Sequence, residues 1–165
     1  MERTAFLALG ANIGDTRKNL HAAVRLLRAG GCNVTAVSSL YLTKPVGMTD
    51  QPDFLNAVVE VKTALTPHDL LGFCRAIEHV LGRERTIHWG PRVIDVDILI
   101  YEGAVLDDTE LVLPHPRMLE RAFVLIPLAE IAPELRLADG LTASESAEQI
   151  DRAGVERTTN GSWSD

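Results

Sequence analysis

The sequence predicts an α+β fold with a ferredoxin-like βαββαβ core, in which helices pack on an antiparallel sheet. Strand-length segments that are apolar or alternate in polarity occur at 4–9, 32–42, 55–61 and 94–101. Apolar residues recur at helical spacing over 17–29 and 67–81. The order of these segments is that of a split βαβ unit, and we expect both helices on one face of the sheet.

Local signals define the ends of both expected helices. Asp15 or Thr16 can cap the first helix, and Gly30-Gly31 ends it. The second helix begins at Thr66-Pro67, because proline suits the first helical position, and it ends at Gly82. Each helix should bury its apolar stripe against the sheet.

The last third of the chain is less regular. A short extended piece at 111–113 precedes a helical turn at 116–120 and an apolar run at 123–131. We assign residues 1–142 to a single domain and 143–165, which are acidic, polar and rich in Ser and Thr, to a C-terminal extension. We expect some helix near 144–153 and disorder in the last eight residues.

Two long polar segments, 43–53 and 83–92, have no regular pattern. Loops of this length in a compact domain are usually functional or disordered. Both lie next to the motif residues discussed below, so we expect them to act as lids that close over a substrate.

Composition bounds the class of protein. The chain has 165 residues, of which 46% are hydrophobic, and this is enough for one domain with a substantial core. Its formal net charge of −7 is a poor basis for general nucleic-acid binding. We expect small-molecule partners, no nucleic acid, no membrane, and a monomer.

The cysteines and the hydropathy pattern predict the compartment. Cys32 and Cys74 lie far apart with no C-x-x-C motif, so neither a disulfide framework nor a zinc site is indicated. The apolar segment 5–9 is too short for a signal peptide, and no segment approaches the roughly 20 apolar residues that span a bilayer. We therefore expect a soluble cytoplasmic protein.

The fourth expected strand carries two carboxylates, Asp95 and Asp97, which should share one face of the sheet because side chains alternate along a strand. The apolar side chains of this strand should share the other face: Ile94, Val96, Ile98 and Ile100. Adjacent carboxylates repel, and a hard cation such as Mg2+ with phosphate oxygens as further ligands would relieve that repulsion. The alternative is a pair of solvated aspartates on an exposed face.

The flanking segment supports an anionic ligand. Residues 83–92 hold three arginines and one glutamate, plus His88, directly before the two aspartates. Such a run is often only a solvated surface. The chain has no G-x-x-x-x-G-K-[ST] loop, so phosphate charge would have to be met by metal and arginine.

The sequence His88-x-Gly90-Pro91-Arg92-x-x-Asp95-Val96-Asp97-Ile98-Leu99 resembles the signature of the 6-hydroxymethyl-7,8-dihydropterin pyrophosphokinase family. The likeness covers about residues 4–140 and fades in the tail. Further matching segments follow in the expected order: Leu9–Asn12, Ser38–Pro45, Gln51–Asn56, Pro114-His115, Arg121, Phe123 and Ile131–Pro133.

The resemblance implies a transferase of the diphosphokinase type in tetrahydrofolate biosynthesis. It would transfer diphosphate from ATP to 6-hydroxymethyl-7,8-dihydropterin and release AMP. The implied cofactor is magnesium, as two ions held by Asp95 and Asp97, with ATP as co-substrate. Such catalysis depends mainly on positioning and charge neutralisation, and no side chain stands out as a general base.

The resemblance also implies residue roles. The implied catalytic residues are Arg83, Arg85, Arg92, Asp95 and Asp97. The implied pterin contacts are Gly10, Thr43, Pro45, Val46, Phe54, Asn56 and Phe123. The implied nucleotide contacts are Glu78, Arg85, Trp89, Arg92, Ile98, His115 and Arg121.

The residues alone allow simpler interpretations. Phe54 and Phe123 suit a core, and His115 suits a structural position. Phe54 stands where the family commonly has Tyr; it keeps an aromatic stacking face but loses the hydroxyl.

Two other classes of protein also fit the chain. One is a different metal-dependent enzyme, a nucleotidyltransferase or phosphohydrolase, and the other is a non-catalytic ferredoxin-like module. Binding of a pterin would distinguish the predicted enzyme from the first class. Mg2+-dependent binding of ATP would distinguish it from the second class.

Overall fold

A six-stranded antiparallel sheet forms the centre of the molecule, in a computed structural model that describes residues 1–45, 47, 49–82, 92–158 and 163–165. Its strands are β1 (Arg3–Ala11), β2 (Asn33–Val37), β3 (Tyr41–Thr43), β4 (Phe54–Thr63), β5 (Asp95–Tyr101) and β8 (Val155–Arg157). The order is β5-β1-β4-β3-β8, and β2 also pairs with β4. A separate hairpin pairs β6 (Leu106–Asp107) with β7 (Val112–Leu113).

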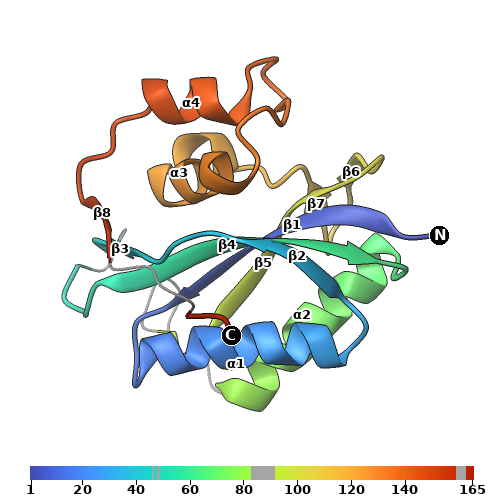
Figure 1. Ribbon diagram of the computed structural model, residues 1–165, viewed down its shortest axis with the longest axis horizontal. Coiled ribbons are helices and arrows are strands. Elements are labelled where there is room, and N and C mark those ends of the chain that lie inside the picture. Colours follow the sequence, from blue (N-terminus) through green and yellow to red (C-terminus); the bar gives the residue numbers. More distant parts are fainter. Residues whose placement is uncertain (46, 48, 83–91, 159–162) are drawn as a thin grey trace.

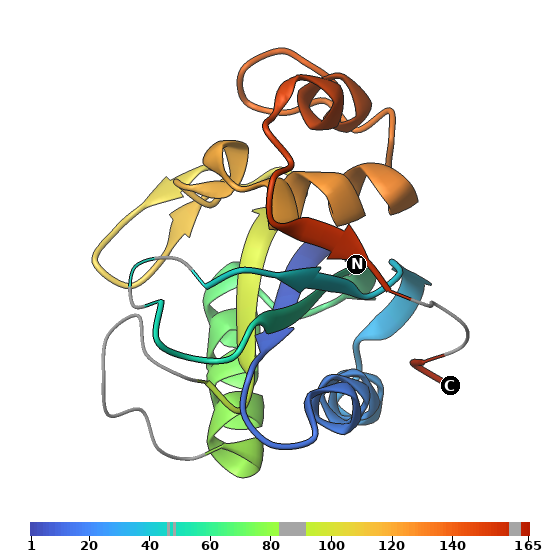
Figure 2. The same ribbon diagram turned by 90° about the vertical axis from the view of Figure 1, so that its left-hand side faces the viewer.

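Helices cover both faces of the sheet (Figure 1). The helices α1 (Thr16–Ala29) and α2 (Pro67–Leu81) pack on one face, as expected. On the other face lie α3 (Ala122–Ile131) and α4 (Ala143–Gln149), preceded by a 3-10 turn at Met118–Glu120 (Figure 2). The α+β class and the placement of the two expected helices on one face are confirmed, and α3 and α4 add a second helical layer on the opposite face.

The sequence of α3, from Ala122 to Ile131, shows no helical period because every residue in it except Glu130 is apolar. Such a helix is buried on more than one side. Here it lies between the sheet and α4, and its buried Val124, Leu125 and Leu128 form a second core cluster with Phe6 and Val58 of the sheet.

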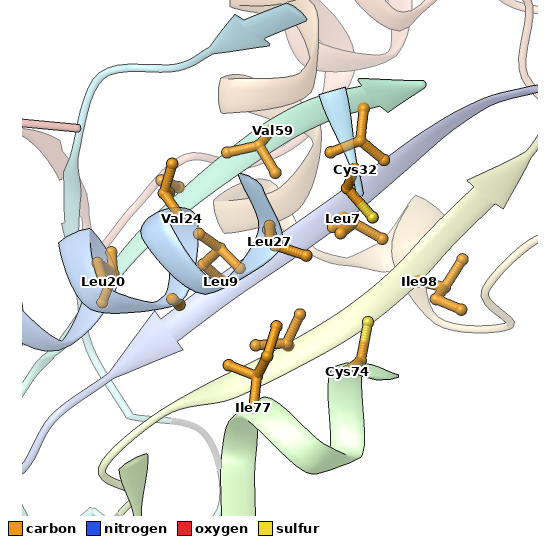
Figure 3. Packing of buried hydrophobic residues seen from close by; sticks show 14 of the residues in the cluster. Leu7, Leu9, Leu20, Val24, Leu27, Cys32, Val59, Cys74, Ile77 and Ile98 are labelled. Atoms are coloured by element: carbon orange, nitrogen blue, oxygen red, sulfur yellow. The ribbon is translucent and has the colours of Figure 1, made fainter. Parts of the chain in front are cut away.

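The main core lies between the sheet and the first helix pair (Figure 3). Leu20, Val24 and Leu27 of α1 point towards Leu7 and Leu9 of β1, and all five are essentially inaccessible to solvent. The N-terminal caps of α1 and α2 are at the residues that the sequence indicated. The Asp15 side chain accepts a hydrogen bond from the Lys18 amide, and Thr66 accepts one from Asp69.

The expected single strand 32–42 is instead two strands, because the backbone is interrupted at 38–40. The Ser38 hydroxyl accepts a hydrogen bond from the Val58 amide at 2.9 Å and donates to the Ser39 carbonyl at 2.8 Å. The Ser39 amide donates to the Glu130 carboxylate of α3 at 3.0 Å. Side chains thus replace the normal ladder partners at this point.

A second departure lies in β5. The register with β1 shifts between Phe6 and Leu7, so that Ile100 pairs with Phe6 while Ile98 pairs with Leu7. Leu99 is the extra residue of this irregularity. Ile98 faces the main core as expected, but Ile100 packs against the second cluster. The prediction that Ile100 shares a face with Ile98 is therefore wrong.

The end of the chain is packed against the domain. The Trp163 side chain is 5% exposed and its indole N–H donates to the Ser38 carbonyl at 2.9 Å. The Arg28 guanidinium donates to the Ser164 carbonyl at 2.8 Å. Disorder was expected for the last eight residues, 158–165. This is wrong for Thr158, whose amide donates to the Leu40 carbonyl at 2.9 Å, and for 163–165; residues 159–162 lie outside the part that the structure describes. The helix expected near 144–153 is present as α4, with a capping box between Thr142 and Glu145.

No helix within the described ranges is both long and apolar enough to cross a bilayer.

Candidate active site

A cavity of about 480 Å³ opens on the face of the sheet that carries α3, beside the N-terminal end of that helix. It extends from β5 across β1 and β4 to β3. Most of the site residues implied by the sequence line it: Gly10, Thr43, Phe54, Asn56, Arg92, Asp95, Asp97, His115, Arg121 and Phe123. The structure therefore gathers residues from between positions 8 and 124 around one space.

The two aspartates lie at the β5 end of the cavity, on the face predicted from strand alternation. Asp95 is partly buried, with 30% of its side chain exposed, and Asp97 is exposed. The Arg92 Nε atom lies 3.7 Å from Asp95 Oδ1. Hard carboxylate oxygens in an open cavity suit a cation such as Mg2+. Among the described residues, no group of three or more His, Cys, Asp or Glu side chains is placed to hold a metal ion.

Glu78 holds this strand from the side. Its carboxylate Oε2 accepts a hydrogen bond from the Val96 amide at 2.8 Å, between the two aspartates in sequence. Glu78 was expected to contact the nucleotide, but it is not among the residues that line the cavity. The structure shows a bond from α2 to the outer edge of β5 instead.

Asn12 connects three chain segments around the site. Its side-chain amide donates to Gln51 Oε1 at 2.8 Å and to the Pro52 carbonyl at 2.9 Å. Its Oδ1 accepts from the Arg92 amide at 2.8 Å, and its own backbone amide donates to the Arg92 carbonyl at 2.9 Å. Asn12 is 3% exposed. Sequence reasoning missed this role, because a turn alone accounts for an Asn after a strand.

The hydrogen bonds of His115 define its tautomer. The Arg117 amide donates to His115 Nδ1 at 3.1 Å, so the ring proton of the neutral form lies on Nε2, which can donate to an anion. Burial, and then the charges of Arg121 and Arg117, lower the pKa of His115 below its usual 6.5. His115 is therefore a neutral donor at physiological pH.

Cations gather on the α3 side of the cavity. Arg121 lies over the Phe123 ring, with its guanidinium carbon 5.6 Å from the ring centroid. Burial lowers the pKa of Arg121, and the charge of Asp97 opposes that effect. Lys44 and Arg117 also line the cavity, and neither was singled out from the sequence. The charge of this region suits a polyphosphate.

At the other end, Asn56 has a defined orientation. Its Nδ2 donates to the Thr43 hydroxyl at 2.7 Å, and both side chains are buried. A Cβ atom on Gly10, which pairs with Asn56 across the sheet, would lie 2.7 Å from Asn56 Oδ1. Only glycine at this position leaves room for the amide. Phe54 and Phe123 line the same region, which suits a flat heteroaromatic ring.

Several expected contacts lie elsewhere or outside the description. Ile98 is buried in the main core beneath the sheet. Pro45 is partly buried but does not line the cavity. Residues 83–91 of the lid expected at 83–92 lie outside the ranges that the structure describes. So do four expected site residues: Val46, Arg83, Arg85 and Trp89.

Paired carboxylates, arginines and aromatic rings around one cavity are typical of an enzyme that transfers phosphoryl or pyrophosphoryl groups. A family model described as 7,8-dihydro-6-hydroxymethylpterin-pyrophosphokinase (HPPK) matches residues 6–133. The chain belongs to this family, and the enzyme class predicted from the sequence, a pyrophosphokinase, is confirmed.

Individual relatives agree with this assignment. The chain is 54% identical over 154 residues to the 2-amino-4-hydroxy-6-hydroxymethyldihydropteridine pyrophosphokinase of Methylorubrum extorquens, covering 93% of this chain and 97% of that protein. It is 46% identical over 130 residues to a mitochondrial folate synthesis bifunctional protein of Arabidopsis thaliana, covering 79% of this chain but 24% of the relative.

A solved structure shares the fold. The Plasmodium falciparum HPPK-DHPS crystallised with pteroate has a TM-score of 0.73 and 17% identity, covering 90% of this chain and 42% of that one. At this identity the likeness supports the fold alone.

Proposed function

We propose that this chain transfers the terminal diphosphate of ATP to the hydroxymethyl oxygen of 6-hydroxymethyl-7,8-dihydropterin, releasing AMP, as a step of folate biosynthesis. The observation that carries the proposal is the arrangement of the cavity. Asp95 and Asp97 lie at its β5 end, while Phe54, Phe123 and Asn56 lie over β4 and α3. A pterin at one end and a triphosphate at the other would meet within one space.

We propose Asp95 and Asp97 as the protein ligands of two Mg2+ ions. When bound, these ions would neutralise triphosphate charge and lower the pKa of the attacking hydroxyl. The Arg92 Nε atom, 3.7 Å from Asp95 Oδ1, helps to orient this carboxylate, so that less reordering is needed when the substrates arrive.

Basic side chains bind the phosphates in this proposal. Arg92 and Arg121 offer planar guanidinium groups that match pairs of phosphate oxygens, and neutral His115 donates from Nε2. Arg83 and Arg85 remain proposed partners on sequence grounds. Catalysis then comes mainly from positioning and from charges placed in advance of the reaction.

The pterin would stack between Phe54 and Phe123, with its polar edge towards Asn56. Because the Asn56 amide donates to Thr43, its remaining donor and its oxygen have a defined direction before the ligand binds. The reacting hydroxymethyl group would then point along the cavity towards Asp95 and Asp97.

The reaction itself is the test. The protein is incubated with ATP, Mg2+ and the hydroxymethyl dihydropterin, and the products are analysed by 31P NMR and mass spectrometry. We expect AMP and the pterin diphosphate in equal amounts, no ADP, and loss of turnover with EDTA or in Asp97→Asn. Inorganic pyrophosphate in place of the pterin diphosphate would indicate a hydrolase and contradict the proposal.

We also propose a monomeric enzyme of the cytoplasm. Cys32 and Cys74 are buried free thiols, which suits a reducing compartment. Size-exclusion chromatography with light scattering tests the oligomeric state, and a mass near 36 kDa, twice that of the 18.0 kDa chain, would contradict it.

A further inference from the structure

The strand β8 completes the sheet beside the candidate pterin site. It pairs with β3, so that Thr43 opposes Val155 and Leu42 opposes Glu156. The Lys44 amide donates to the Gly154 carbonyl at 3.1 Å, and the Thr158 amide donates to the Leu40 carbonyl at 2.9 Å. In an antiparallel ladder with these flanking bonds, Leu42 and Glu156 form the hydrogen-bonded pair at the centre.

On its other side, β3 pairs with β4 and carries the hydroxyl that orients Asn56. β3 has three residues, so it contributes few ladder bonds of its own and its position depends on both neighbours. Figure 1 shows β3 and β8 side by side at the end of the sheet away from β5.

Side chains strengthen this attachment. Arg157 of β8 lies 3.6 Å from the Glu130 carboxylate, which also accepts a hydrogen bond from the Tyr41 hydroxyl at 2.8 Å. The Trp163 indole donates to Ser38. Residues of the C-terminal extension therefore contact the segment that contains β3 at several points, from Ser38 to Lys44.

The same extension forms the wall of a second cavity of about 310 Å³. Asp151, Gly154 and Val155 line it, together with Thr43 and Phe123, which also line the candidate active site. The family model ends at residue 133, so the match assigns no role to this extension.

We propose that β8, together with Gly154, is a positioning element for pterin recognition. It fixes β3, β3 fixes the Thr43 hydroxyl, and Thr43 orients the Asn56 amide towards the pterin edge. The inference rests on the proposed function, since it assigns the Thr43–Asn56 pair to pterin binding. ATP recognition, which rests mainly on β5, His115 and Arg121, should depend on β8 much less than pterin recognition does.

The test is Glu156→Pro, which removes the backbone donor at the centre of the β3–β8 ladder. The matched control is Glu156→Ala, which keeps that donor and removes only an exposed side chain. We expect Glu156→Pro to raise the Kd and KM for the pterin on the order of tenfold, as for one lost oriented hydrogen bond. The Kd for a non-hydrolysable ATP analogue and kcat at saturating pterin should stay within about twofold, and the control should match the wild type.

Coupling to Asn56 separates positioning from general stability. Asn56→Ala alone should weaken pterin binding, and adding Glu156→Pro should then cost much less than tenfold, because the oriented group is already absent. Equal losses for both ligands, or full additivity with Asn56→Ala, would overturn the inference. If Asn56→Ala leaves pterin binding unchanged, the proposed pterin site itself is wrong.

A second variant covers the case in which Glu156→Pro does not fold. Gly154 has φ +81°, and a Cβ there would lie 3.1 Å from Lys44 Cγ, so Gly154→Ala strains the same junction with every backbone donor present. We expect a smaller increase in pterin Kd, coupled to Asn56 in the same way. Unchanged pterin Kd in folded Gly154→Ala would contradict the proposal.

Discussion

The protonation and orientation of single site residues are set by hydrogen bonds to residues distant in sequence or to backbone amides. His115 is a donor from Nε2 because the Arg117 amide occupies Nδ1. Asn56 has one orientation because Thr43 accepts from it and Gly10 makes room for it. The types of these residues suggested binding, but their hydrogen bonds decide which atoms face the ligand.

At this scale the pH dependence of stability reports on His115. Its pKa is lowered in the folded protein, so the unfolded chain binds more protons below pH 6.5. Stability contributed by the neutral ring is present above pH 6.5 and is lost as the pH falls through the lowered pKa. We expect His115→Gln to reduce the fall in unfolding free energy below pH 6.5, measured by urea denaturation at several pH values. Parallel curves for the two proteins would contradict this prediction.

At the scale of secondary structure, helices support the strands that carry the site residues. The helix α2 lies against β5 and supplies Glu78 to the outer edge of that strand, at the amide of Val96. The same helix packs Ile77 and Cys74 into the main core (Figure 3). The aspartates therefore project from a strand that is supported on its edge as well as on its buried face.

Glu78 tests this support. Glu78→Met removes the acceptor for the Val96 amide, which should cost about 1–3 kcal/mol of stability and raise the Mg2+ concentration needed for half-maximal turnover. Glu78→Gln keeps an acceptor oxygen and should retain most of both properties. The measurements are urea denaturation and Mg2+ titration of AMP formation. A higher KM for ATP with an unchanged Mg2+ requirement would instead favour a direct nucleotide contact.

At the scale of the whole molecule, the last residues of the chain pack against the N-terminal part of the domain. Trp163 lies against the interruption between β2 and β3, and Ser164 and Asp165 contact α1 through Arg28 and His21. The C-terminal extension thus touches both layers, since α4 packs on α3 and the last residues pack beside α1 (Figure 2).

Removal of the Trp163 ring should therefore destabilise the domain. Trp163→Ala should lower the unfolding free energy by roughly 3 kcal/mol, as for other buried aromatic side chains. Trp163→Phe keeps most of the packing but loses the bond to Ser38, and should cost about 1 kcal/mol. Chemical denaturation followed by circular dichroism measures both. Wild-type stability in Trp163→Ala would show that the end of the chain contributes nothing to folding.

The sequence by itself determined what depends on short-range pattern. Strand alternation placed Asp95 and Asp97 on one face, cap residues located both ends of α1 and α2, and the motif around Arg92 indicated the family. These features extend over a few residues, so local periodicity and backbone preference are sufficient to predict them.

Only the tertiary structure decided the features that need a partner far along the chain. The apolar run of α3 does not indicate which face of the sheet it covers, because a helix that is apolar on nearly all sides can pack on either face. The roles of Asn12, Glu78 and Trp163 require segments about 20 to 125 residues away to supply donors and acceptors. A buried polar group takes whichever partner the fold brings within hydrogen-bond distance, and that choice is a property of the packed molecule.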